Sequence, residues 1–223
     1  MQGLRYCRQM KIRKLAGRSI VQPDKVAVVM TAVGGASDYM RYSLPSVVRY
    51  CDKFGYDFRY VDHVPVDDRH PSWQKLLAFH VVPKHVQLAV LIDSDIFVTP
   101  WAEPIHKYAH KSKLGITFSS HFECGFMTLP RCHRKWAEDL YAVADYKKSG
   151  SWYEQKYVNE SIKRGEVPVG HLDPRWNAIV TKKHVRSKKL IAKRKDRYYM
   201  LHPAGQNAPK NRILRQAFEF FGH

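Results

Sequence analysis

An apolar run that ends in two acids constrains this chain more than any other feature. Residues 87–98 read QLAVLIDSDIFV, the most hydrophobic strand candidate in the sequence. A continuous apolar run without alternation is typical of a strand covered on both faces, as in a parallel sheet. A second run, KVAVVMTAVG at residues 25–34, has the same character and ends in glycine. The fold must therefore bury both strands between layers of helices.

Helical periodicity separates these strands. Residues 37–55 carry apolar residues at helical spacing and close on Gly55, which predicts a helix with a glycine C-cap and with Pro45 near its start. We expect a second strand at residues 56–62 and a second helix at residues 70–82. The alternation of strand and helix over the first hundred residues indicates an α/β fold with a parallel sheet.

The pattern loosens after Pro104, and the remaining elements are shorter. The length of 223 residues suits one domain, which we place at residues 25–223 behind a basic arm at residues 1–24. Residues 167–180 read as irregular. Short strands are expected at 114–119, 125–130 and 197–202, and helices at 134–146, 151–164 and 211–221.

The net charge of +18 is concentrated in two segments. Residues 1–23 hold six basic residues and no acid, and residues 182–197 hold nine basic residues and one acid. The rest of the chain is nearly balanced. Clustered positive charge predicts an anionic partner, such as a nucleotide, DNA, a phosphorylated glycan or a membrane surface, while a role in solubility alone is the simpler alternative.

Several classes of protein are excluded or disfavoured. No apolar run approaches the roughly 18–20 residues that cross a bilayer. The N-terminal residues lack the apolar stretch that a signal peptide contains. Four cysteines are too few and too scattered for a disulfide framework in a chain of this length. These features predict a cytoplasmic protein with reduced thiols.

Asp93 and Asp95 carry the clearest chemistry. Residues two apart in an extended chain point to the same face, and two carboxylates on one face repel each other unless a cation lies between them. Hard oxygen ligands suit Mn²⁺ or Mg²⁺. Ligands of open α/β sheets bind at the carboxyl ends of strands, where this pair is expected. The alternative is a solvated turn with two unrelated acids.

These residues and five other segments resemble the GT-A class of nucleotide-sugar glycosyltransferases, families 8 and 34 in particular. The resemblance covers about residues 25–205 and predicts a Rossmann-like mixed sheet flanked by helices. Its elements, in order, are the first strand at Thr31 and Ala32, the helix with Ser72-Trp73-Gln74-Lys75, the Asp-Ser-Asp motif, the Glu123-Cys124-Gly125 strand, the helix with Glu154, Gln155 and Asn159, and His202-Pro203-Ala204-Gly205.

The resemblance implies roles for individual residues. Asp93, Asp95 and His202 would hold Mn²⁺ or Mg²⁺, with metal binding weakening below about pH 6.5 as the histidine takes up a proton. Gln155, Glu154 and Glu123 are the catalytic candidates. The donor-binding candidates are Thr31, Ala32, Asp62, Trp73, Lys75, Ser94, Cys124, Gly125, Gly205 and Lys210.

Two departures leave the donor sugar and the stereochemistry open. Cys124 stands where such enzymes usually have Asn, and Glu154 where they have Asp. A retaining reaction, favoured by Gln155 and His202, needs no strong base. An inverting reaction needs a carboxylate from Glu123, Glu154 or Asp173 to deprotonate the acceptor. For several candidates a structural role is an equal alternative: core packing for Trp73, and exposed positions for Lys75, Glu154 and Gln155.

The expected reaction moves a sugar from a nucleotide-diphospho-sugar, with a UDP-sugar favoured, to a hydroxyl group. The acceptor is a glycan, a glycolipid or a protein, or a hydroxylated DNA base, which would suit a small virus-type enzyme in the host cytoplasm and the positive charge. A non-catalytic nucleic-acid-binding module is the alternative, and a metal-dependent nuclease ranks last because acids are sparse after Asp95. A zinc site at His121, Cys124, Cys132 and His133 is disfavoured by the spacing.

Overall fold

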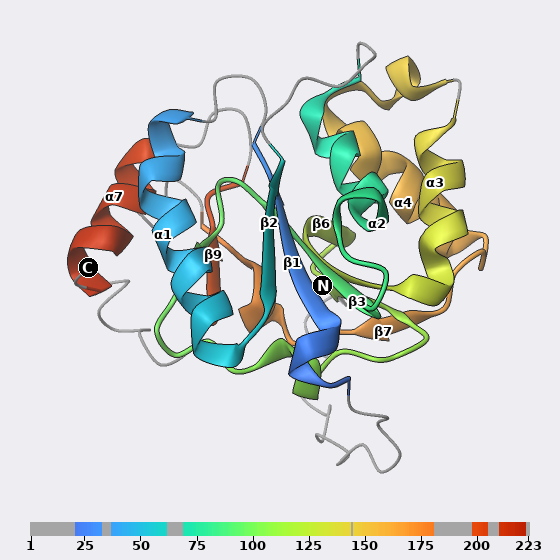
Figure 1. Ribbon diagram of the computed structural model, residues 1–223. Coiled ribbons are helices and arrows are strands. Elements are labelled where there is room, and N and C mark those ends of the chain that lie inside the picture. Colours follow the sequence, from blue (N-terminus) through green and yellow to red (C-terminus); the bar gives the residue numbers. More distant parts are fainter. Residues whose placement is uncertain are drawn as a thin grey trace, which may run out of the picture.

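The computed structural model describes residues 21–32, 37–61, 69–143, 145–180, 198–204 and 210–221 (Figure 1). Most of the expected basic arm and all of residues 182–197 lie outside these ranges, as do Asp62 and Gly205. The division of the chain at residue 24 therefore stays a prediction.

A six-stranded mixed sheet forms the centre of the molecule, which confirms the expected α/β architecture. Its strands, in spatial order, are β2 (Asp57–Val61), β1 (Val26–Thr31), β3 (Leu88–Asp93), β6 (Phe122–Pro130), β5 (Leu114–Phe118) and β7 (Val169–His171). β1 runs parallel to both β2 and β3, whereas β6 runs antiparallel to β3 and β5. β7 runs parallel to β5 at the edge.

Helices cover both faces of this sheet (Figure 1). On one side lie α1 (Ser37–Phe54) and α7 (Lys210–Phe221), and on the other α2 (Ala78–Val81), α3 (Arg134–Tyr141) and α4 (Tyr153–Lys163). Alternate residues of β1 enter the two cores: Val28 packs with Val47 of α1, and Val29 packs in the cluster that contains Ala137 of α3. Both faces of β1 are buried, as the unbroken apolar run predicts.

Short 3-10 helices connect these elements. They are η1 (Pro23–Lys25), η2 (Pro71–Leu77), η3 (Ile105–Lys107), η4 (Arg131–His133), η5 (Tyr146–Trp152) and η6 (Pro174–Asn177). In the described part of the chain no helix is long and apolar enough to cross a membrane.

A second, three-stranded sheet lies beside the first and was not expected. It consists of β4 (Phe97–Val98), β9 (Met200–His202) and β8 (Ala178–Ile179), with β9 in the middle. Residues 87–98 are therefore not one strand. β3 stops at Asp93, a turn follows in which the Ile96 amide donates to the Asp93 carbonyl at 3.1 Å, and β4 pairs with β9 instead.

Three other expectations need correction. The expected helix at residues 70–82 is mostly η2, because apolar spacing does not distinguish i+3 from i+4 hydrogen bonding over so short a stretch. Pro45 lies inside α1 rather than near its start. The stretch 167–180 contains β7, η6 and β8, whose two- and three-residue strands are too short to show a periodicity.

Trp176 joins the two sheets and provides a test of this packing. Its buried ring stacks on Phe126 of β6, with centroids 5.5 Å apart, and contacts Tyr199 at 4.8 Å. We predict that Trp176→Ala lowers the free energy of unfolding by about 3–5 kcal/mol, since it leaves a large cavity. Urea denaturation would measure this. Trp101→Ala is the control: that ring is 38% exposed, and its loss should cost about 1 kcal/mol or less. If the two variants lowered the free energy of unfolding equally, the role of Trp176 in packing the two sheets together would be wrong.

Candidate functional site

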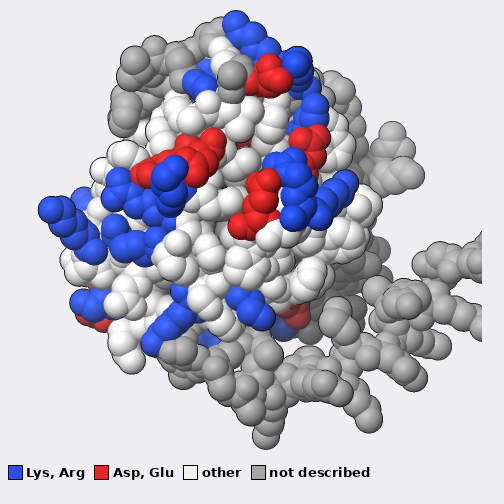
Figure 2. Space-filling view, turned by 90° about the vertical axis from the view of Figure 1, so that its right-hand side faces the viewer, with Lys and Arg blue, Asp and Glu red and all other residues white. Residues whose placement is uncertain are grey.

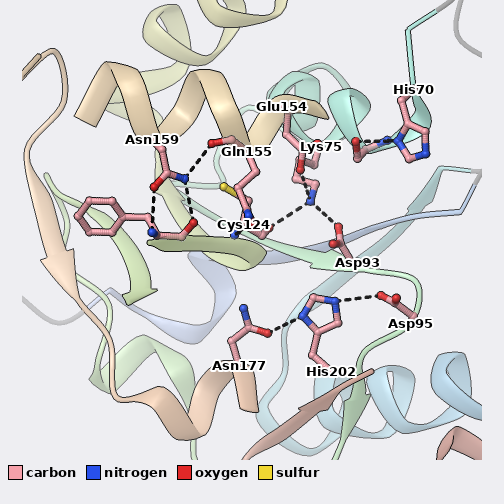
Figure 3. A network of polar contacts seen from close by, with 12 residues as sticks. His70, Lys75, Asp93, Asp95, Cys124, Glu154, Gln155, Asn159, Asn177 and His202 are labelled. Carbon is pink, nitrogen blue, oxygen red and sulfur yellow. Dashed lines mark hydrogen bonds and ion pairs between the residues drawn. The ribbon is translucent and has the colours of Figure 1, made fainter. Parts of the chain in front are cut away.

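Asp93, Asp95 and His202 come together between the two sheets (Figure 3). Each offers one ligand atom, and these atoms all lie within 4.8 Å of one another. Asp93 ends β3, Asp95 lies in the following turn, and His202 ends β9. Two carboxylate oxygens and an imidazole nitrogen form a donor set that fits a divalent cation such as Mn²⁺ or Mg²⁺.

Serine hydroxyls of α1 hold the Asp-Ser-Asp turn in place. The Ser43 hydroxyl donates to the Ser94 carbonyl at 2.6 Å, and the Ser46 hydroxyl accepts from the Val98 amide at 2.9 Å. Both serines are buried, so these bonds are made away from water. The helix thus anchors the turn from both sides and fixes the direction in which Asp95 leaves the chain.

Asn177 orients the imidazole of His202. The amide oxygen of Asn177 lies 2.8 Å from Nδ1 of His202 (Figure 3). Because an amide oxygen only accepts hydrogen bonds, Nδ1 carries the proton and Nε2 is left to face Asp95, 3.3 Å away. Asn177 ends η6, in the stretch that the sequence left irregular, and no motif pointed to it.

Gly125 leaves the space that His202 occupies. A Cβ atom built on Gly125 would lie 2.2 Å from Cε1 and 2.5 Å from Nδ1 of the imidazole. No side chain fits there without displacing the ring. Gly125, which the resemblance to GT-A enzymes assigns to donor binding, is therefore also required by the packing of His202, a candidate metal ligand.

The buried ammonium group of Lys75 connects Asp93 to the rest of the site. It pairs with Asp93, contacts Oε1 of Glu154 at 2.9 Å and donates to the carbonyl of Cys124 at 3.1 Å (Figure 3). Burial alone would lower the pKa of Lys75, but the two carboxylates more than offset it and raise the pKa above its usual value. The exposed position allowed for Lys75 and Glu154 is wrong, since both are buried.

Lys210 is a second cation at the site. Its ammonium lies 2.6 Å from Oδ2 of Asp95. Burial would raise the pKa of Asp95, but His202 and Lys210 together lower it below its usual range. Asp95 is therefore ionised at neutral pH, as a metal ligand must be.

The amide side chains of α4 bind the backbone of β6. Gln155 accepts from the Cys124 amide at 2.9 Å, while Asn159 bonds both the amide and the carbonyl of Phe122 at 2.9 Å (Figure 3). Burial raises the pKa of the Cys124 thiol well above its usual value, so it stays protonated. Tyr153, just before Glu154, has a φ of 47° and stacks on His70 at 3.6 Å between ring centroids. A non-glycine residue in this region is strained, as is often seen at functional sites.

The other predicted residues lie at varying distances from this cluster. Trp73 is 1% exposed and packs on Tyr157, so in this structure it serves the core. Thr31 and Ala32 are buried at the end of β1. Glu123 accepts from the Ser119 hydroxyl at 2.6 Å and lies 3.2 Å from His121. Asp173 begins η6 and accepts from the Arg175 amide at 2.9 Å. The roles of all these residues stay predictions.

No zinc cluster forms from the histidines and cysteines considered above. In the part of the chain that the structure describes, the Asp93, Asp95 and His202 group is the one set of three potential ligands close enough to share an ion. Cys132 is exposed and donates to the Lys111 carbonyl instead.

The sequence matches no protein-family model and no curated protein, but the fold is similar to solved structures. A glycosyltransferase involved in the glycosylation of the major capsid of PBCV-1 aligns with a TM-score of 0.68 and 16% identity, over 85% of this chain and 98% of that one. The glycosyltransferase GlyE of Streptococcus pneumoniae TIGR4 aligns with a TM-score of 0.60 and 13% identity, over 90% of this chain and 61% of that one. At these identities the similarity establishes the fold, and the expected GT-A fold is confirmed.

The contact between Gly125 and His202 gives a test of the metal site. We predict that Gly125→Ala displaces the imidazole and weakens Mn²⁺ binding at least about tenfold, as loss of a ligand or its support does. Calorimetric titration with Mn²⁺ would measure this. Gly170→Ala is the matched control, because its Cβ would meet Lys113 Cβ at an ordinary 3.6 Å. Unchanged Mn²⁺ binding in Gly125→Ala would remove His202 from the site.

The pKa of His202 gives a second test. Burial alone would lower this pKa, but the Asp95 carboxylate, with Asp93 beyond it, raises it above the usual 6.5. A protonated Nε2 cannot bind a metal, so a raised pKa makes protons compete at higher pH. We predict that, as the pH is lowered, Mn²⁺ affinity begins to fall while the pH is still above 6.5. The sequence alone predicted a fall only below about pH 6.5.

Titration with Mn²⁺ between about pH 5.5 and 8 would follow this change, since the range spans the ordinary histidine pKa. His133→Gln, which alters a half-buried histidine on η4 outside the candidate site, should keep the same profile. An affinity that is flat over this range, or that falls only below pH 6, would contradict the prediction.

Proposed function

We propose that this chain is a metal-dependent glycosyltransferase that moves a sugar from a nucleotide-diphospho-sugar to a hydroxyl acceptor. The observation that carries the proposal is the Asp93, Asp95 and His202 group at the end of the central strand of a GT-A fold. The two carboxylates lie where ligands of open α/β sheets bind. The similar solved structures are described as glycosyltransferases, which supports the same reaction class.

The donor set suits Mn²⁺ or Mg²⁺, and a UDP-sugar is the proposed donor. A divalent cation held by these side chains would supply positive charge where negative charge develops on the departing diphosphate. Lys210 lies at the same place, against Asp95, and can offer its ammonium to a phosphate oxygen. Burial raises the pKa of Asp93, and the paired ammonium of Lys75 opposes that shift without reversing it. A direct contact between Lys75 and the donor stays a prediction.

The donor would lie over the carboxyl ends of β1 and β3. Thr31 ends β1 and Ala32 follows it, and Ser94 separates the two acids. The backbone of Cys124 and Gly125 passes beside Lys75 and His202, which supports the proposal that it contacts the transferred sugar. Asp62 and Gly205 are proposed donor contacts outside the described residues.

We propose a retaining reaction. Gln155 and Glu154 lie at the start of α4, and both contact the site: Gln155 through the Cys124 amide and Glu154 through Lys75. A neutral amide at this position can stabilise positive charge on the sugar ring without acting as a base. The carboxylates that an inverting reaction would use are Glu123, Glu154 and Asp173, and Asp173 is already bound by the Arg175 guanidinium at 3.0 Å.

A hydroxylated DNA base was one of the acceptors considered, and a nucleic-acid-binding module without catalysis was the alternative function. Figure 2 shows the side of the molecule that carries α3 and α4, where basic and acidic side chains lie next to one another. Arg134 pairs with Glu138, Lys135 with Asp139 and Arg164 with Glu166. A duplex-binding face would need unpaired cations. These pairs reduce the positive charge that this face offers to DNA, and most of the two basic segments lies outside the described residues.

Donor hydrolysis tests the proposed function. With a panel of UDP-, GDP- and TDP-sugars and Mn²⁺, we expect release of one nucleoside diphosphate, lost with a chelator. Asp93→Asn and Asp95→Asn should lower the rate by at least about a hundredfold, since each removes charge from the site. Asp139→Asn, which changes an exposed acid on α3, should leave the rate unchanged. The anomeric configuration of the product, read by NMR, decides between retention and inversion.

A contrary result would be equally clear. If no nucleotide-sugar binds, and the protein binds DNA or RNA with an affinity that falls steeply with salt, the binding module is the better description.

A further inference from the structure

A small cavity adjoins the proposed metal site on the side of β5 and η6. Its volume is about 240 Å³, and Asn177, the residue that orients His202, forms part of its wall. The cavity is thus one side chain away from a proposed metal ligand. The other lining residues are Thr117, Phe118, Ser119, Glu123, Pro174, Arg175, Ala178, Ile179 and Tyr198.

Two polar atoms of this wall have no hydrogen-bond partner among the described residues. They are the hydroxyl of Thr117 and the amide nitrogen of Asn177, and both are buried. Thr117 is 2% exposed and Asn177 4%. The amide oxygen of Asn177 is bound to His202, and its nitrogen is turned away from the imidazole (Figure 3). Buried polar groups without partners are rare and destabilising, which suggests that a ligand completes them.

The charge inside the cavity favours a neutral ligand. Among the described residues, the charged side chains that line it are Glu123 and Arg175. Arg175 is neutralised by two contacts with Asp173 at 3.0 Å. Glu123, in contrast, contacts the Ser119 hydroxyl and the imidazole of His121, so its carboxylate remains an acceptor for further hydroxyl donors. A phosphate placed there would meet this carboxylate and be repelled.

Thr117 and Glu123 face each other across the ladder between β5 and β6, at the irregularity where the register shifts. Phe118, the next residue of β5, is 49% exposed at the rim and contacts Phe122 edge-on at 5.2 Å. A carboxylate, a hydroxyl and an amide beside an exposed aromatic ring offer hydrogen bonds to ring hydroxyls and an apolar surface to the ring face. This combination suits a sugar.

We propose that this cavity binds the acceptor, and that the acceptor is a neutral sugar unit held by Thr117, Glu123 and Asn177. The proposal rests on the proposed function for the reaction and names its acceptor class. The volume is below the roughly 300–1,000 Å³ of typical ligand pockets, so the cavity takes one ring rather than an oligosaccharide. Among the acceptors that the sequence left open, this favours a glycan over a hydroxylated DNA base.

The closing experiment uses two buried threonines with unpaired hydroxyls. Thr117→Val removes the hydroxyl in the cavity wall. Thr128→Val, on β6 and outside the cavity lining, removes a hydroxyl that is also buried and has no partner among the described residues. The probes are the methyl glycosides of glucose, galactose, mannose, xylose and N-acetylglucosamine, with binding read by saturation-transfer NMR in the presence of UDP and Mn²⁺. We expect at least one glycoside to bind, with an affinity that Thr117→Val weakens roughly five- to tenfold, the equivalent of one hydrogen bond.

Thermal unfolding separates a binding role from a structural one. Both valine variants remove an unsatisfied group, so both should keep or raise the melting temperature. Only Thr117→Val should also weaken the glycoside. In turnover assays with the nucleotide-sugar donor, Thr117→Val should raise the KM for the glycoside and leave kcat unchanged. Weaker binding accompanied by a lower melting temperature, or an equal loss in Thr128→Val, would overturn the proposal.

The outcomes also distinguish this proposal from the proposed function. If a nucleotide-sugar binds but no glycoside does, the acceptor assignment fails alone. If a glycoside binds in a Thr117-dependent way and no nucleotide-sugar binds, the cavity is a sugar site and the transferase proposal fails. If an oligonucleotide carrying 5-hydroxymethylcytosine binds and Thr117→Val weakens it, the acceptor is a DNA base and the neutral-sugar class is wrong.

Discussion

The buried ammonium group of Lys75 is the interaction on which the site depends. Moving a charge out of water is costly, and the cost is met only if the charge finds close partners. Lys75 finds three: a carboxylate on β3, a carboxylate on α4 and a backbone carbonyl on β6. β3 and β6 are already paired in the sheet, and Gln155 and Asn159 of α4 bond the backbone of β6. Lys75 adds the link between Asp93 and α4, because its ammonium pairs with a carboxylate on each. The carboxylate of Asp93 is thereby held against α4 by one buried lysine.

A second constraint comes from the place where β3 ends. If the chain had continued as a strand through Val98, Asp95 would have lain on the sheet and His202 could not have approached it. The turn at Asp93 instead sends residues 97–98 into a different sheet, where β4 pairs with β9. That pairing brings His202 back to the acids. The second sheet is small, but it is the element that converts a pair of carboxylates into a three-ligand group.

The sequence predicted the parts of this arrangement that are encoded locally. The strands β1 and β3 are continuous apolar runs, and the Asp-Ser-Asp motif follows one of them directly, so strand, edge and carboxylates could be placed by position alone. The similarity to known motif spacings also brought in His202, Gly125 and Gln155. Asn177, Thr117 and the burial of Lys75 could not be predicted, because each depends on contacts between segments far apart in the chain. Asn177 lies 25 residues from the histidine it orients, in a stretch without periodicity.

The two sides of the site differ in charge, and in the proposed reaction this difference would separate the donor from the acceptor. The side toward Asp95 carries Lys210, with Lys75 beneath Asp93, and suits the negative diphosphate of a donor. The side toward β5 carries Glu123, with Arg175 bound by Asp173, and suits a neutral polyol. A nucleotide that entered the wrong side would meet a carboxylate, and a neutral sugar brings no negative charge to pair with two ammonium groups. Asn177 stands between them, with its oxygen on the imidazole of one side and its nitrogen in the wall of the other. Because one amide serves both sides, occupation of the acceptor cavity would restrain the same residue that sets the direction of His202.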